Sequence, residues 1–71
     1  MIWDYKKLRG RIKEVCGTQD ELANKIGIGR VSLSKRLNNQ LDFEQEEIFK
    51  VCDVLGIEYS EIPAYFFTEE V

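Results

Sequence analysis

Two closely spaced helix boundaries in the first half of the chain constrain the fold more than any other feature. Residues 18–21 read Thr-Gln-Asp-Glu, which is a capping box: the Thr18 hydroxyl accepts the amide hydrogen of Glu21, and the Glu21 carboxylate reaches back. Gly27 follows soon afterwards, and glycine commonly ends a helix because it adopts the left-handed conformation without strain. The pattern therefore predicts a short supporting helix from Thr18 to Ile26.

A second short helix begins almost at once, after a corner at residues 27–29. The corner reads Gly-Ile-Gly, with one apolar residue between two conformationally permissive ones. The second helix is predicted from Arg30 to Asn38, and it is docked on the core by Leu33 and Leu37, which are one turn apart. At about 100° per residue, its outward side carries Val31, Lys35 and Asn38, with Ser32 and Ser34 beside them.

Apolar residues at helical spacing predict a first helix over residues 5–15, with Asp4 as its cap. The expected core residues of this first helix are Tyr5, Leu8, Ile12 and Val15. After the second short helix the chain turns at 38–39, where asparagine tolerates left-handed geometry. Phe43 is expected to enter the core just beyond that turn.

Two more helices fill the rest of the chain. Asp42 is expected to cap the fourth helix, and Gly56 ends it. The inward residues of the fourth helix are Ile48, Val51, Cys52 and Leu55. Ser60, with Pro63 in the first turn, opens a short final helix, whose apolar residues are Ile62, Tyr65 and Phe66.

The 71 residues are therefore expected to form one domain, 1–71, of the all-α class, with five short helices. Apolar residues at 44% and charged residues at 32% are typical of a globular protein. Cys16 and Cys52 are the two cysteines and no histidine is present, so a zinc site would lack its usual ligands. Both thiols are expected to be free and buried.

Charge is unevenly distributed along the chain. Residues 1–36 carry nine basic against four acidic side chains, a balance of +5, whereas residues 37–71 carry one basic against nine acidic side chains, a balance of −8. The net charge of −3 therefore conceals a polarised molecule. A basic surface attracts phosphates even on an acidic protein, because salt screens the distant charges beyond about 10 Å.

Residues 18–37, T-Q-D-E-L-A-N-K-I-G-I-G-R-V-S-L-S-K-R-L, resemble the lambda-repressor-like, Cro-type helix-turn-helix family. In that family Gln opens the first helix of the motif, Ala faces the second, and Gly-Ile-small forms the turn. The resemblance continues through Leu37-Asn38-Asn39 and Phe43 to Leu55-Gly56-Ile57, so that about 55 of the 71 residues take part. It implies a lambda-repressor-like DNA-binding domain of a small phage or prophage regulator, whose second helix enters the major groove.

Two residues depart from the family pattern. Asn39 stands where the family usually has glycine, and Arg36 stands where many members have an aliphatic core residue. We expect the Arg36 stem to pack on the core while its head extends to the solvent.

The resemblance and the outward face of residues 30–38 together define a candidate DNA-binding site. Arg30 is long enough to reach guanine, and Val31 suits a thymine methyl group. Lys35 lies one turn beyond Val31 and suits a base or a phosphate. The full set of predicted DNA-binding residues is Gln19, Arg30, Val31, Ser32, Ser34, Lys35 and Asn39. Additional basic residues of the first helix would supply a non-specific field, that is, an electrostatic attraction for DNA that does not depend on its sequence: Lys6, Lys7, Arg9, Arg11 and Lys13.

Three consecutive aromatic residues, Tyr65, Phe66 and Phe67, exceed what a short final helix buries alone. They predict either a homodimer surface or the completion of the monomer core. A dimer would place two recognition helices one DNA turn apart, about 34 Å, on a palindromic operator.

Two functions remain open. The first is a cytoplasmic, sequence-specific repressor that occupies a double-stranded DNA operator as a homodimer. The alternative is a phage antirepressor or modulator that uses the same fold to bind another repressor protein, which the acidic second half would suit. An enzyme is not expected, because no nucleophile lies beside a recognisable base or metal cluster. No cofactor is expected, and the chain lacks the apolar stretch of a membrane span.

Overall fold

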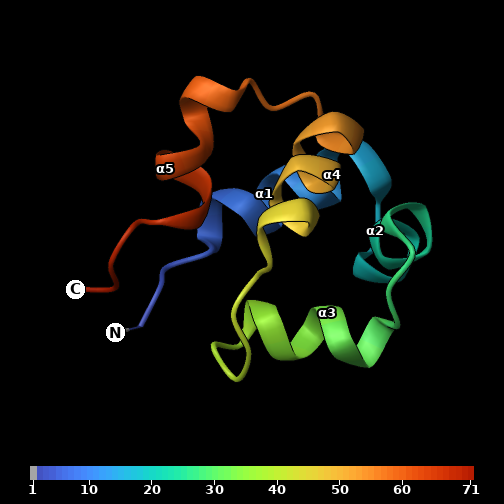
Figure 1. Ribbon diagram of the computed structural model, residues 1–71, viewed down its shortest axis with the longest axis horizontal. Coiled ribbons are helices and arrows are strands. Elements are labelled where there is room, and N and C mark those ends of the chain that lie inside the picture. Colours follow the sequence, from blue (N-terminus) through green and yellow to red (C-terminus); the bar gives the residue numbers. More distant parts are fainter. Residues whose placement is uncertain (1) are drawn as a thin grey trace.

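The computed structural model describes residues 2–71, which form five α-helices and one short 3-10 turn (Figure 1). The elements are α1 (Lys6–Cys16), α2 (Gln19–Ile26), α3 (Arg30–Leu37), α4 (Gln45–Leu55), η1 (Tyr59–Glu61) and α5 (Ile62–Phe66). The predicted all-α fold of five short helices is confirmed. No helix among residues 2–71 is long and apolar enough to cross a bilayer.

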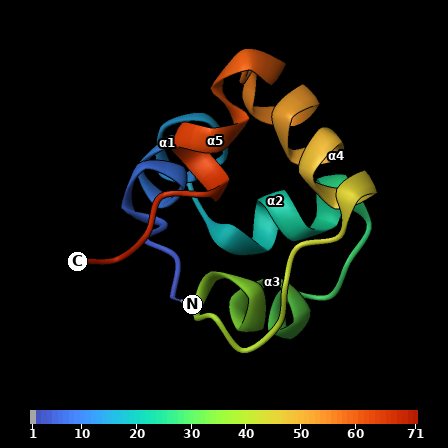
Figure 2. The same ribbon diagram turned by 60° about the vertical axis from the view of Figure 1, so that its left-hand side comes forward.

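The core lies where α1, α2, α4 and α5 meet, and α3 closes it from one side. In Figures 1 and 2 α3 runs along the lower edge of the molecule, with the other helices above it. Leu33 and Leu37 dock α3 and are 0% and 3% exposed, as the sequence predicts. The other fully buried side chains come from all four remaining helices: Leu8, Ile12, Leu22, Val51, Cys52, Leu55 and Phe66.

The chain ends pair with each other, an arrangement that the sequence does not predict. Trp3 and Glu69 form an isolated antiparallel bridge, in which the Asp4 amide donates to the Thr68 carbonyl at 2.7 Å. Asn39 joins this pairing from the end of α3. Its side-chain oxygen accepts the Trp3 amide hydrogen at 2.8 Å, and its side-chain nitrogen donates to the Trp3 carbonyl at 3.0 Å. A single amide side chain therefore binds Trp3 as a neighbouring strand would.

Several details of the helices differ from the prediction, including the N-cap residue of α1, which is Tyr5 and not Asp4. Val15, expected in the core, is 42% exposed. The half-buried Cys16 takes its place, because Cys16 lies closer in angle to Ile12 around the helix than Val15 does. Asp42 does not cap α4; Glu44 is the N-cap residue, and its amide donates to the Glu47 carboxylate at 2.8 Å.

The aromatic residues of the C-terminal segment divide between the core and the surface. Tyr65 and Phe66 are 9% and 1% exposed, so they complete the monomer core and are not available to the dimer surface predicted for them. Phe67 is 50% exposed and packs edge-on against Trp3, with the ring centroids 5.6 Å apart. Phe67 alone among the three remains open to a partner.

Candidate functional site

Local sequence signals position α3 as predicted. The Thr18 hydroxyl accepts the Glu21 amide hydrogen at 3.2 Å at the start of α2. Gly27 ends α2 with φ of 79°, a left-handed value that a side chain would strain. Gly29 is extended and α3 begins at the next residue. The structure therefore contains two short helices in contact across a tight glycine corner, which is the geometry of a helix-turn-helix.

The outward face of α3 presents one apolar and one basic side chain that have no partner within residues 2–71. Val31 is 62% exposed. Lys35, also exposed, lies one turn further along and enters no ion pair within residues 2–71. Arg30 differs, because its guanidinium lies 3.7 Å from the Asp20 carboxylate on α2. That pair is largely exposed and contributes little to stability, but it places an acidic charge at the start of the predicted recognition helix.

Three other predicted DNA-binding residues are engaged within the protein. The Ser32 hydroxyl accepts a hydrogen bond from Arg36 at 2.6 Å. The Ser34 hydroxyl accepts one from Asn38 at 3.2 Å, and the Asn39 amide is bound to Trp3 as described above. Both serines only accept in these bonds, so their hydroxyl hydrogens remain able to donate to a phosphate, whereas a DNA contact by the Asn39 side-chain oxygen would have to replace or share the bond to Trp3.

Gln19 lies apart from the α3 residues, at the first turn of α2. It is half-buried and lines a shallow pocket with Arg9 and Lys13 of α1. The structure thus gathers six of the seven predicted residues on α3 and its end, and places Gln19 at the neighbouring helix start.

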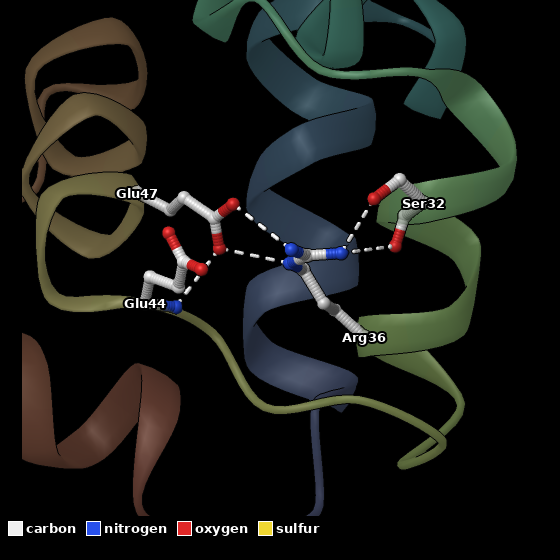
Figure 3. Close-up of polar contacts among 4 residues, drawn as sticks. All are labelled: Ser32, Arg36, Glu44 and Glu47. Carbon is white, nitrogen blue, oxygen red and sulfur yellow. Dashed lines mark hydrogen bonds and ion pairs between the residues drawn. The ribbon is translucent and has the colours of Figure 1, made fainter.

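Arg36 and Glu47 form a buried ion pair between α3 and α4 (Figure 3). The guanidinium donates to both carboxylate oxygens, with its Nε 2.8 Å from Oε1 and one terminal nitrogen 3.0 Å from Oε2. The other terminal nitrogen donates to the Ser32 carbonyl and hydroxyl. The prediction that the Arg36 head reaches solvent is therefore wrong. Glu47, which no local sequence pattern relates to Arg36, holds the guanidinium inside the protein.

This arrangement determines the ionisation of Glu47. Burial alone would raise the pKa of its carboxyl group, but hydrogen bonds from Arg36 and from the Glu44 amide oppose that effect. Together with the charges of Arg36 and Lys50 they outweigh it, so the pKa of Glu47 lies below the ordinary value of 4.5. Glu47 is therefore ionised at neutral pH, and the pair orients α3 on α4.

The basic side chains of α1 also serve the fold. Arg9 donates to the Leu37 carbonyl and the Asn38 side chain, each at 3.0 Å, at the end of α3. Arg11 donates to the Leu55 carbonyl at 2.9 Å at the end of α4, and the Lys7 ammonium lies 4.7 Å from the centre of the Tyr65 ring. Basic groups at helix C-termini satisfy carbonyls that lack an intrahelical partner. Two of the five basic residues of the predicted non-specific field, Arg9 and Arg11, are thus committed to holding helix ends.

Comparison with known protein families identifies the family of this chain. Residues 1–69 match the family described as "Protein of unknown function (DUF739)". The chain belongs to this family. A comparison of this DUF739 protein with curated proteins gives no match.

The DUF739 protein is also similar to a solved structure, described as the solution structure of the modulator of repression (MOR) of the temperate bacteriophage TP901-1 from Lactococcus lactis. The two sequences are 39% identical, the TM-score is 0.82, and the match covers 94% of this chain and 90% of that chain. The similarity therefore extends over nearly the whole of both proteins and supports a small phage regulator. The narrower Cro-type assignment stays a prediction.

Proposed function

We propose that this DUF739 protein modulates repression by binding a repressor protein. The observation that carries the proposal is its full-length similarity to the phage modulator of repression, at 39% identity and a TM-score of 0.82. The sequence leaves two functions open, and repressor binding is the alternative to direct operator binding.

The distribution of polar partners supports a protein partner. Arg30, Ser32, Ser34 and Asn39, four of the seven predicted DNA contacts, already have partners within the chain. Residues 37–71 carry a balance of −8, and this charge would repel a polyanion while attracting a basic protein surface. An exposed apolar Val31 suits a protein contact as well as a thymine methyl group.

Binding would change repression through linkage. If the modulator binds the DNA-free repressor more tightly than the operator-bound repressor, operator occupancy falls by the ratio of the two affinities. The opposite preference would raise occupancy. Equal affinity for both states would leave operator occupancy unchanged, however tight the complex.

Direct operator binding is the second candidate. It is favoured by the tight corner between α2 and α3 and by the exposed Val31 and Lys35 on the outward side of α3. In this case the chain would act as a Cro-like repressor, and its homodimer would span two half-sites about 34 Å apart.

One pair of measurements separates the two candidates. The purified protein is titrated with a repressor protein from its own genome, and in parallel it is used to select sequences from random double-stranded DNA at low salt. We expect a stoichiometric complex with the repressor and no enriched DNA motif. An enriched motif whose affinity falls with salt at about −0.9 per phosphate contact, without a repressor complex, would replace the proposal with operator binding.

A further inference from the structure

A pocket of about 240 Å³ opens between the N-terminal segment, the chain just before α4, and α5. Its walls are mostly aromatic, and the residues that matter here are Trp3, Tyr5, Asp42, Phe43, Phe66 and Phe67. The pocket is separate from the outward face of α3, since neither Val31 nor Lys35 lines it. None of the predicted DNA-binding residues lines it either.

The aromatic walls are held in place by the fold. Phe43 packs edge-on against Tyr5 at 5.6 Å and against Phe66 at 5.3 Å between ring centroids. The Trp3 backbone is fixed by two bonds to the Asn39 side chain, and the Trp3 ring packs against Phe67. A pocket whose walls are already ordered loses little conformational entropy when it is filled.

One acidic side chain, Asp42, lines the pocket. Asp42 enters no ion pair within residues 2–71. Burial, and then the charge of Asp42, raise the pKa of the Tyr5 phenol, so this group stays protonated at neutral pH. The pocket thus combines aromatic faces with an unpaired carboxylate.

We propose that this pocket receives an arginine side chain, with its apolar neighbours, from the repressor; this inference rests on the proposed function. The guanidinium is weakly hydrated, stacks on aromatic rings and forms paired hydrogen bonds with a carboxylate. An acidic partner residue would be repelled by Asp42. A purely apolar one would bring no compensation for water removed from the rim.

The first test uses a small probe. Amide and indole resonances of the labelled protein are followed while acetyl-Leu-Arg-Leu-amide is added, and the control peptide has glutamine in place of arginine. We expect shifts at Trp3, Phe43 and Phe67 with the arginine peptide, and about tenfold weaker binding of the control, since a charge-assisted hydrogen bond is lost. Asp42→Asn should lower the affinity for the arginine peptide to the affinity for the control peptide.

The second test uses the repressor itself. Asp42→Asn and Phe67→Ala should each weaken repressor binding about tenfold, while Glu58→Gln, an exposed carboxylate outside the pocket, should bind as the unchanged chain does. Thermal unfolding of each variant verifies that it is folded.

The outcomes are distinguishable. Equal binding of the two peptides, or unchanged repressor affinity in Asp42→Asn, would overturn the pocket proposal and leave the proposed function standing. Failure of the unchanged chain to bind the repressor would overturn both. Self-association that Asp42→Asn abolishes would assign the pocket to a second copy of this chain, and would also overturn the proposal.

Discussion

Replacing Arg36 by methionine should destabilise the protein severely, although the substitution makes the side chain more apolar. Both oxygens of the Glu47 carboxylate are bound by the guanidinium, at 2.8 and 3.0 Å, and both side chains are nearly buried. Removing one member of such a pair leaves a charge without compensation and costs about 3–5 kcal/mol. A chain of this length has a total stability of only about 4–10 kcal/mol. The single variant is therefore expected to be barely folded.

The double variant Arg36→Met with Glu47→Leu should recover most of the loss. Replacing a buried pair by apolar residues of similar size is often close to neutral, so we expect the double variant within about 1 kcal/mol of the unchanged chain. Urea unfolding, followed by helical circular dichroism, measures all of these values. On heating, the single variant should lose at least about 12 °C in Tm, because 1 kcal/mol shifts Tm by about 4–8 °C in a domain of this size.

The pH dependence gives an independent check. Because the pKa of Glu47 is lowered on folding from its ordinary value of 4.5, its ionisation stabilises the folded state above pH 4.5. That contribution is lost as the pH falls through the lowered pKa. The double variant lacks it, so its stability should decline less in acid. The reasoning is refuted if Arg36→Met costs less than about 1 kcal/mol, or if the double variant is no more stable than either single one.

Three further predictions concern other parts of the molecule. Asn39→Gly keeps the left-handed φ of 62° and loses only the bonds to Trp3, whereas Asn39→Ala loses the same bonds and adds backbone strain. In thermal unfolding the alanine variant should therefore be about 1 kcal/mol less stable than the glycine variant. Burial, and then Asp53, raise the pKa of the Cys52 thiol, so a thiol reagent should modify Cys16 first and Cys52 only on unfolding; equal rates would contradict this. Val31→Asp should change stability by less than about 0.5 kcal/mol, and a larger loss would mean that Val31 is not free.

Local signals were sufficient for the boundaries of the central helices. The Thr18 cap and Gly27 both act within one turn of the helix end that they define, so their effect can be worked out without knowing the rest of the fold. The docking leucines of α3 were predictable for a similar reason, since helical spacing alone places Leu33 and Leu37 on one side.

Polar contacts between distant residues could not be predicted in this way. Arg36 and Glu47 belong to different helices, α3 and α4, and only the tertiary fold, in which both helices contact α2, brings them together. The one available signal was that Arg36 stands where many members of the resembling family have an aliphatic core residue, since a guanidinium buried there needs an acidic partner. Asn39 and Trp3 are 36 residues apart, and nothing in either local pattern relates them. The internal partners of the predicted DNA-binding residues could not be predicted for the same reason, because these partners depend on tertiary structure.

The pairing of Trp3 with Glu69 has a practical consequence for anyone who attaches a second protein to this one. A protein fused to either terminus would be attached beside the aromatic pocket and would obstruct access to it. The outward side of α3 would remain accessible. Joining the two ends through a short linker and reopening the chain at an exposed loop would carry the attachment elsewhere. Such a circular permutant would also show how far the helices depend on the order in which they are connected.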